Sequence, residues 1–315
     1  MSEPAESRQK SLSDWIGHET RKPHPTGTQA FLEAIHTRWP TGVGAVIFYG
    51  SCRRSQHPEG LYDLYVILDN TRDLPPVERT LLTVLPPNVY YLEVSDPVSG
   101  QTLRSKTTLI PLHRFHRGMN WFHSYLWARF CQPVTLVYAR NEHLEQAIQH
   151  ILEAAVCSFI RHALPLLPQQ FDAETLWITG LRASYQAELR SEGPQRANTI
   201  FANDPDYYRG VTSELSGRLS YSYSTETRRY ENRLKPVQRT LGRLGWVVRI
   251  GFGKLLSLAR ILKGWVTFEG GLDYIVWKLE RHSGQSIEIP SRVRRRPLVY
   301  LWPFFWQLYK QGIFR

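Results

Sequence analysis

Two β-rich runs close together in the chain constrain its fold more than any other feature. Val43–Tyr49 is almost wholly apolar and ends in Gly50-Ser51, and Leu61–Leu68 follows after a polar loop. Runs of this length, rich in β-branched and aromatic residues, predict buried strands. Further strands are expected over residues 88–94, 106–110 and 134–138. Because helical segments lie between these runs, residues 29–140 are predicted to form a mixed α/β domain.

The segments on either side of this predicted domain differ from it in composition and periodicity. Residues 1–28 are polar and rich in proline towards their end, which predicts a loose leader. Apolar residues recur at spacings of three and four between Leu144 and Ile160, which predicts a long amphipathic helix. Residues 141–235 are therefore expected to form a smaller, mostly helical domain.

Residues 236–315 combine apolar and basic side chains. Apolar residues from Val237 to Leu262 fall on one helical face, and arginines and lysines fill the others. Further on, a basic cluster runs directly into the aromatic residues Trp302, Phe304, Phe305 and Trp306. We expect this region to lie on an anionic membrane surface, the alternative being packing on the protein's own core. No apolar run approaches the roughly 18 residues that a spanning helix needs.

The charge balance narrows the class of partner. The 39 Lys and Arg residues outnumber 28 Asp and Glu residues, giving a formal net charge of +11. Such an excess points to an anionic partner: nucleic acid, nucleotide or acidic membrane. Only three cysteines occur, and their scattered positions argue against a disulfide framework or a cysteine-rich zinc site.

Gly50-Ser51 and Asp63 form the most informative motif. A strand ending in Gly-Ser, followed by an acid on the next strand, is the layout of nucleotidyltransferases related to DNA polymerase β. Glycine lets the backbone approach a triphosphate, and the serine hydroxyl can donate to its oxygens. A carboxylate on the neighbouring strand can hold Mg²⁺, which bridges phosphate oxygens. Tyr65 stands where that superfamily carries a second acid, and the alternative is a plain turn beside a solvated Asp63.

Several segments together resemble the mitochondrial-type phosphatidate cytidylyltransferases, the translocator maintenance family of CDP-diacylglycerol synthases. The segments that carry the likeness are, in chain order, Tyr49–Ser51, Asp63–Asp69, Asn88–Tyr91, Leu103–Lys106, Tyr125–Val134 and Gly180–Arg190. In that family, too, the residue two after the first aspartate is not acidic, so Tyr65 agrees with it.

The resemblance implies a reaction and an architecture. CTP and phosphatidic acid would give CDP-diacylglycerol and pyrophosphate, with Mg²⁺ as cofactor. A polymerase-β-like nucleotidyltransferase domain would be followed by a winged-helix-like domain and C-terminal amphipathic helices that contact a membrane.

The resemblance also implies roles for particular residues. The nucleotide-binding residues would be Tyr49, Gly50, Ser51 and Tyr65. The catalytic residues would be Asp63, Lys106 and Arg129. The candidate metal ligands are Asp63, Asp69 and Glu93. As plainer alternatives, Lys106 would be an edge-strand lysine and Arg129 a surface arginine, and Glu188 is expected to form a surface pair with Arg190.

Two other functions fit the sequence. The first is nucleotidyl transfer to another acceptor, which includes a polynucleotide, a small molecule or a protein. The second is a non-catalytic binding module on the same scaffold. Tyr65, which is not acidic, counts against the first of these functions, and no nucleic-acid partner is expected. The N-terminus resembles neither a secretory signal nor a transit peptide, so we expect a cytoplasmic protein, peripheral on the inner membrane, rather than a mitochondrial one. The oligomeric state stays open.

Overall fold

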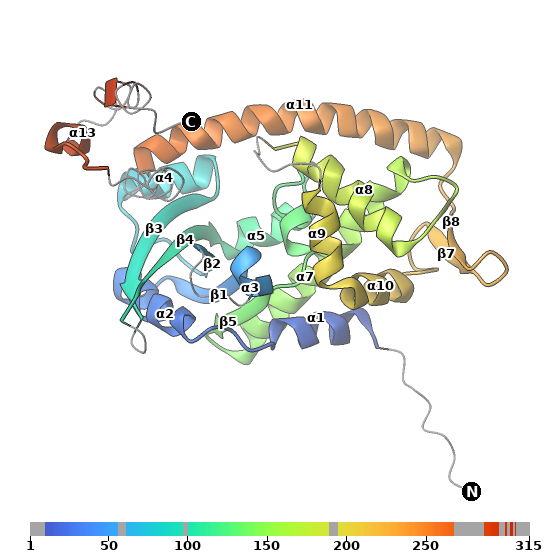
Figure 1. The fold of residues 1–315 in the computed structure, drawn as a ribbon, viewed down its shortest axis with the longest axis horizontal. Helices are drawn as coiled ribbons and strands as arrows, with labels where there is room; N and C mark the ends of the chain where they lie inside the picture. The colour runs from blue at the N-terminus through green and yellow to red at the C-terminus, as the bar shows by residue number, and fades with distance from the viewer. Residues whose placement is uncertain are drawn as a thin grey trace, which may run out of the picture.

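A five-stranded mixed sheet forms the centre of one half of the molecule (Figure 1). The computed structural model describes residues 10–55, 61–96, 100–188, 195–267 and 287–295, together with residues 300, 303, 304 and 306. The strands are β1 (Val43–Tyr49), β2 (Leu61–Leu68), β3 (Asn88–Ser95), β4 (Thr102–Pro111) and β5 (Thr135–Ala139). Their order is β3-β4-β2-β1-β5, with β2 and β4 parallel and the other neighbours antiparallel. The predicted mixed α/β class is confirmed.

Helices cover both faces of this sheet. Alternate residues of β1 and β2 face opposite sides, so each central strand contributes to two apolar clusters. One face packs against α2 (Gly27–Arg38) and α4 (Pro76–Val84). The other packs against α5 (Leu112–Met119), α6 (Trp127–Phe130) and α7 (Glu142–Ala163). Burial on both sides explains why these two strands read as nearly continuous apolar runs.

Residues 12–20 form a helix instead of part of the loose leader that the polarity of this segment predicts. Helix α1 (Leu12–Thr20) begins with a capping box, in which Ser11 and Asp14 bond each other's backbone N–H groups. Leu12 and Ile16, four residues apart, are buried in the main core. Gly17, Glu19 and Thr20 are buried as well, but few residues of this helix are apolar, and such a sparse apolar pattern is easily taken for a coil.

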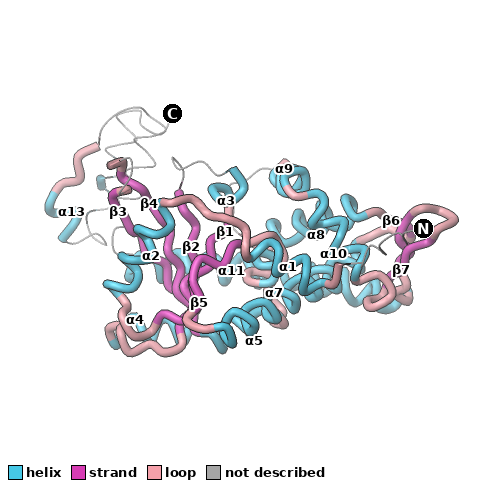
Figure 2. The backbone as a smooth tube through the Cα atoms, turned by 90° about the horizontal axis from the view of Figure 1, so that it is seen from below, coloured by secondary structure: helices cyan, strands magenta, loops and turns pink. Residues whose placement is uncertain are grey.

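The other half of the molecule is mostly helical, as predicted. Its elements after α7 are η1 (Leu164–Leu166), α8 (Ala173–Gln186), α9 (Arg196–Asn203) and α10 (Pro205–Glu214). A small sheet, ordered β6-β8-β7, is formed by β6 (Gln170–Phe171), β7 (Tyr221–Ser224) and β8 (Arg229–Asn232). Figure 2 shows β6 and β7 at the opposite end of the molecule from the large sheet. One apolar cluster continues from the large sheet through α7 and α8, so the two halves share a core.

Helix α11 (Pro236–Thr267) runs along one side of the whole molecule (Figure 1). Its basic side faces the protein: Arg243 donates to the carbonyl oxygen of Pro165 at 3.1 Å, and Lys263 to that of Pro87 at 2.8 Å. Its outer side carries exposed apolar residues, namely Val237, Leu241, Leu244, Val247, Val248, Phe252, Leu255 and Leu258, which we call the α11 stripe. The helix is therefore amphipathic with its apolar side outward.

Little of the aromatic tail falls within the described residues. A short helix, α13, spans Ser291–Arg295. Phe304 is buried and Trp306 is exposed, whereas Trp302 and Phe305 lie outside the described residues. Along the described chain, no helix combines the length and the apolar character needed to cross a bilayer.

Candidate functional site

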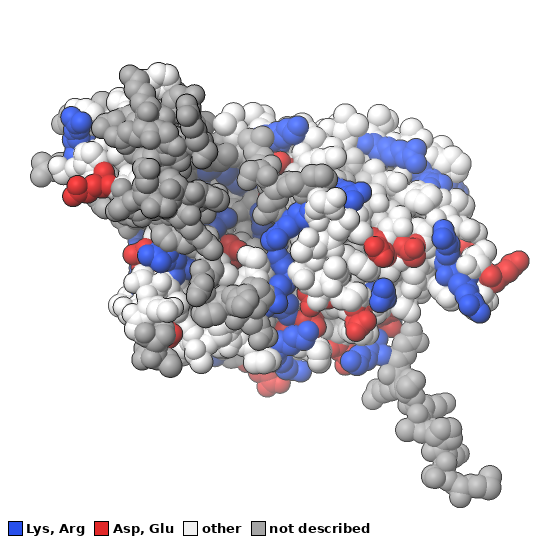
Figure 3. Space-filling view, viewed as in Figure 1, with Lys and Arg blue, Asp and Glu red and all other residues white. Residues whose placement is uncertain are grey.

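A cavity of about 480 Å³ opens where β1 ends, between the large sheet, the helices of the second half and α11. Its wall contains most of the residues singled out in the sequence, namely Tyr49, Gly50, Ser51, Asp63, Lys106 and Arg129. In the space-filling view, lysine and arginine side chains gather along the hollowed middle of this face (Figure 3). The sequence prediction thus holds for the proximity of these residues.

Strand register brings three of them into one row. Tyr49 of β1 is paired with Asp63 of β2, and Asp63 is paired with Lys106 of β4. Residues paired across a sheet share a face and have neighbouring side chains. The row therefore places a carboxylate between an aromatic ring and an ammonium group, at the edge of the cavity.

Gly50 is required by both its backbone and its neighbour. Its φ angle of +88° lies in the left-handed region. A Cβ atom at this position would lie 2.4 Å from Oδ2 of Asp63. Any other residue would push the carboxylate away from the turn that presents Ser51.

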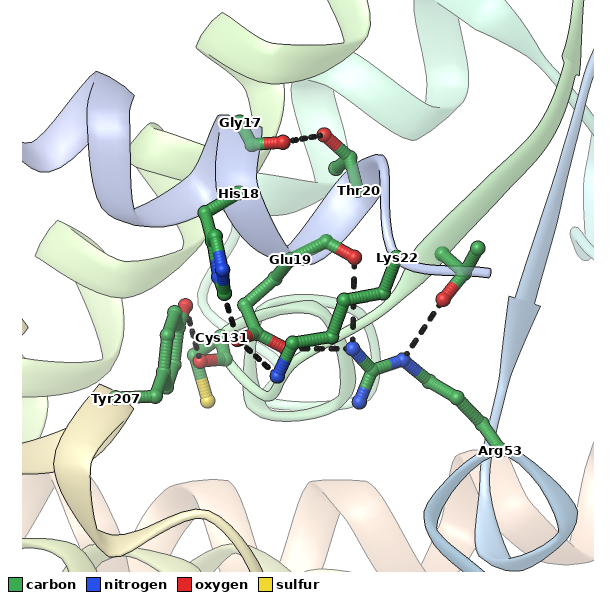
Figure 4. A network of polar contacts seen from close by, with 9 residues as sticks. Gly17, His18, Glu19, Thr20, Lys22, Arg53, Cys131 and Tyr207 are labelled. Atoms are coloured by element: carbon green, nitrogen blue, oxygen red, sulfur yellow. Dashed lines mark hydrogen bonds and ion pairs between the residues drawn. The ribbon is translucent and has the colours of Figure 1, made fainter. Parts of the chain in front are cut away.

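The helix that follows Gly50 is fixed by a buried ion pair. Arg53 of α3 (Ser51–Ser55) donates to Oε2 of Glu19 at 2.6 Å and to Oγ1 of Thr135 at 3.1 Å. Figure 4 shows Glu19 lying between Arg53 and Lys22. Burial alone would raise the pKa of Glu19, but the hydrogen bonds and charges of Lys22 and Arg53 outweigh it and lower that pKa. Helix α1 thus anchors the turn that carries Ser51.

The oxygen atoms near Asp63 are suited to a metal ion that is also bound by substrate phosphates. Within the described residues, no three His, Cys, Asp or Glu side chains come together as a metal site. Mg²⁺ is commonly held by one or two carboxylates together with substrate phosphates and water. Asp63, with the hydroxyl of Ser51 on the same cavity wall, fits that arrangement.

Asp69 and Glu93 do not belong to this site, which corrects their assignment as metal ligands. Asp69 follows the last residue of β2, about six residues or 20 Å along the strand from Asp63. Its Oδ2 lies 2.6 Å from Nη1 of Arg140. Glu93 accepts hydrogen bonds from Arg104 at 3.0 Å and from Tyr91 at 2.8 Å. Neither side chain lines the cavity.

Tyr65 lies buried behind the cavity wall and does not line the cavity. It is fully buried, and its hydroxyl donates to that of Tyr125 at 3.4 Å. Its ring packs edge-on against Tyr49 and Phe130. Burial raises the pKa of Tyr65 well above its ordinary value. Tyr65, predicted to bind the nucleotide, therefore does not line the cavity and contacts its wall through Tyr49 and Tyr125.

Arg129 is held by a carboxylate that the sequence did not assign to it. Its Nη2 lies 3.0 Å from Oε2 of Glu188, and its Nη1 donates to the carbonyl oxygen of Tyr125 at 2.7 Å. Burial would lower the pKa of Arg129, but Glu188 and the nearby tyrosines outweigh it and raise that pKa. The expected surface pair is thus wrong for Glu188, and Arg190 lies outside the described residues.

Three further cations line the cavity, and sequence reasoning missed all three: Arg54, Arg196 and Arg260. Burial, together with the charge of Arg196 on the same cavity wall, lowers the pKa of Arg54. Burial would raise the pKa of Tyr125, but Arg129, Arg260 and Lys106 outweigh it and lower that pKa. Five basic and two acidic side chains of the described chain line the cavity. Its field therefore favours anions.

Comparisons with known proteins add little to this geometry. No protein-family model matches the chain, and no curated protein matches it. Among solved structures, a nucleotidyltransferase-like protein from Exiguobacterium sibiricum 255-15 is similar over 90% of this chain and 91% of its own, at 14% identity and a TM-score of 0.27. A likeness at that TM-score carries no argument about fold or function.

Proposed function

We propose that this protein is a nucleotidyltransferase that makes CDP-diacylglycerol from CTP and phosphatidic acid at a membrane surface. The observation that carries the proposal is the cavity, where Gly50-Ser51, Asp63 and Lys106 meet an excess of arginines. A reaction between a nucleoside triphosphate and a phosphate acceptor brings two polyanions together, so it needs fixed cations at both ends of a site.

The cations of the cavity form two groups, which supports two anion subsites. Arg54 is on the same short helix as Ser51 and is electrostatically coupled to Arg196. Arg129, Arg260 and Lys106 all act on Tyr125. We assign the triphosphate to the first group, beside Ser51, and the acceptor phosphate to the group around Tyr125.

The proposed reaction requires no side chain of the protein to act as a general base. An acceptor phosphate oxygen attacks the α-phosphorus of CTP and forms the new P–O bond. The bond from that phosphorus to the bridging oxygen breaks, and pyrophosphate leaves with the electron pair. Because the attacking oxygen is already ionised, no side chain must remove a proton. This agrees with a site in which a buried tyrosine, Tyr65, replaces a second acid.

The chain's own residues have positioning and electrostatic tasks in this scheme. Ser51 would donate to a phosphate oxygen of the triphosphate, and Lys106, paired with Asp63 across the sheet, would neutralise charge on the acceptor phosphate. Mg²⁺, held by Asp63 and phosphate oxygens, would supply further charge neutralisation when bound. Arg129, balanced by Glu188, would shape the acceptor subsite more than it adds charge to it.

The α11 stripe supports a membrane location for the reaction. Val237, Leu244 and Leu255 are each more than half exposed, at 68%, 57% and 64%. Apolar side chains along one side of a long helix are unusual on a water-facing surface and typical of an interfacial helix. We therefore also propose that α11 rests on the bilayer that holds the lipid acceptor, which for a protein in the cytoplasm is the inner membrane.

Two finer structural assignments accompany the function. We infer that the five-stranded sheet with its helices is a polymerase-β-like nucleotidyltransferase domain. We infer that the helices from α7 to α10, with the β7–β8 hairpin, are a winged-helix-like domain.

The test is transfer of label from CTP to lipid. Purified protein is incubated with CTP labelled at the α-phosphate, Mg²⁺ and vesicles containing phosphatidic acid, and the organic phase is counted. We expect labelled lipid with the wild type and at least about a hundredfold less with Asp63→Asn. Asp206→Asn, the same change on the exposed surface of α10, is the matched control and should retain activity.

Other outcomes separate the competing functions. Label that leaves CTP but stays in the aqueous phase would show another acceptor. No turnover together with no calorimetric binding of CTP and Mg²⁺ would show a non-catalytic module. Either result contradicts the proposal, as does full activity of Asp63→Asn.

A further inference from the structure

The wall of the cavity is completed by α11, the helix that also carries the exposed apolar stripe. Ser257 and Arg260 are its two contributions to that wall. Leu255 and Leu258, only two residues away from each, are exposed. With about 100° of rotation per residue, these two pairs point to opposite sides of the helix. One helix thus faces the cavity with one side and the outside with the other.

Arg260 lies against the ring that defines the acceptor end of the cavity. Its guanidinium carbon is 3.9 Å from the ring centroid of Tyr125, and that of Arg129 is 4.0 Å from the same centroid. Two cations on one ring repel each other unless anions balance both. Glu188 balances Arg129.

Arg260 has weaker protein partners than Arg129. Its Nε donates to the carbonyl oxygen of Pro86 at 3.4 Å, a long hydrogen bond. Its Nη1 is buried and donates to no atom of the described residues. A buried donor without an acceptor is costly and rare, and it calls for an explanation such as an absent ligand. Burial and the charge of Arg260 together lower the pKa of His123 and of Lys263.

We propose that Arg260 binds the phosphate of the acceptor, and that α11 thereby delivers a ligand of the acceptor subsite. This inference rests on the proposed nucleotidyl transfer and names the residue that fixes where the acceptor phosphate lies. An acceptor phosphate at Nη1 would satisfy the buried donor and balance the second cation on Tyr125. Because the other side of α11 carries the stripe, the apolar part of a lipid acceptor has a surface on the same helix.

The test uses an acceptor that needs no membrane. Dihexanoyl phosphatidic acid, kept below its micelle concentration, separates phosphate binding from docking on a bilayer. Arg260→Gln removes the charge and keeps a polar side chain, and Arg260→Lys keeps the charge without the fork of donors. Lys254→Gln removes a charge from an exposed position of the same helix and is the matched control.

We expect Arg260→Gln to raise the KM for this acceptor by about ten- to a hundredfold, the worth of one charge-assisted hydrogen bond. The KM for CTP should stay within about twofold, Arg260→Lys should recover part of the loss, and Lys254→Gln should match the wild type. Unchanged acceptor KM in an active Arg260→Gln enzyme would overturn the inference and leave the proposed function standing.

Direct binding distinguishes failure of the inference from failure of the function. Calorimetry with dihexanoyl phosphatidic acid, in the absence of CTP, measures the subsite without turnover. Weaker binding by Arg260→Gln supports the inference even if the wild type transfers no nucleotide. Equal binding, or none by the wild type, overturns it. Melting temperatures show whether each variant is folded. If Arg260→Gln is unfolded, Arg260→Lys is compared with the wild type instead.

Discussion

Gly50 and Asp63 are packed so closely that a single added carbon atom would displace the carboxylate. The site of that atom is 2.4 Å from Oδ2 of Asp63, and the backbone of Gly50 has a φ angle of +88°. The turn that presents Ser51 and the acid that we assign to Mg²⁺ therefore form one rigid unit.

Gly50→Ala should impair activity more than stability. The added Cβ must move Asp63, so we expect transfer from CTP to fall at least about tenfold, since small misplacement in an active site is expensive. Gly217→Ala is the matched control, because Gly217 has a similar φ of +81° with nothing within 4 Å of its added Cβ. Both variants should lose about 1–2 kcal/mol of unfolding free energy from the left-handed backbone. Equal activity of the two variants would contradict the proposed role of Asp63.

The ion pair between Glu19 and Arg53 should matter for stability. Both side chains are only 6% exposed, and their closest atoms are 2.6 Å apart. Glu19→Gln leaves Arg53 buried without its anion, and we expect a loss of about 3–5 kcal/mol in urea unfolding. The control is Glu145→Gln, whose partner Arg21 is 70% exposed, and there we expect less than about 1 kcal/mol. Similar losses of unfolding free energy in the two variants would show that the buried ion pair stabilises the fold no more than the exposed one.

The α11 stripe should be necessary for binding to lipid vesicles. Replacing Leu241, Val248 and Leu255 together by Gln removes apolar area that a bilayer would bury, worth about 1.5–3 kcal/mol for each side chain. Sedimentation with anionic vesicles should show at least about tenfold weaker binding, while the melting temperature stays near that of the wild type. Val84→Gln, an exposed apolar residue on α4, should bind as the wild type does. Undiminished sedimentation of the triple variant would exclude the stripe as the docking surface.

Acid should destabilise the protein through His123, which is buried, and His162, which is partly buried. Burial, reinforced by Arg260 at His123 and by Arg249 at His162, lowers the pKa of each ring from 6.5 to about 4. Nδ1 of His123 accepts from the backbone N–H of Tyr125 at 3.1 Å, a bond that the protonated ring cannot accept. The folded state therefore keeps both rings neutral while the unfolded chain takes up protons. Their contribution to stability is fully present above pH 6.5 and is lost as the pH falls towards 4.

Urea unfolding at pH 7.5, 6.0 and 5.0 measures this loss. Each histidine should add a slope approaching about 1.4 kcal/mol per pH unit at the lower end. His123→Asn should remove one such contribution, whereas His150→Asn, on the exposed side of α7, should leave the slope unchanged. A wild-type slope that survives in His123→Asn would mean that His123 is already protonated in the fold.

The sheet and part of its site were accessible to sequence reasoning. The apolar runs at β1 and β2 are long, rich in β-branched residues and bounded by polar loops, so their strands were predicted at their observed positions. Gly50 and Ser51 follow the end of β1 and Asp63 lies near the start of β2, so antiparallel pairing of these two consecutive strands brings the three residues together. Asp69 was misassigned because the resemblance to the family's motif was given more weight than the strand rise, which separates it from Asp63 by about 20 Å.

The basic wall of the cavity was not accessible in the same way. Arg54, Arg196 and Arg260 come from three separate segments, and nothing in their local sequence distinguishes them from surface arginines. The orientation of α11 was equally hidden. The periodicity of α11 separates an apolar side from a basic side but does not show which side faces the protein. The basic side faces inward because its side chains donate hydrogen bonds to carbonyl oxygens in η1 and at the end of α4.

The position of α11 in the chain sets when the cavity becomes complete during synthesis. Every other element of its wall precedes residue 197, whereas Ser257 and Arg260 come from the helix that follows both sheets. A nascent chain can close the large sheet and pack α7 against it long before that helix leaves the ribosome. During synthesis the cavity thus receives the last of its basic side chains together with the α11 stripe, the surface that we propose binds the bilayer.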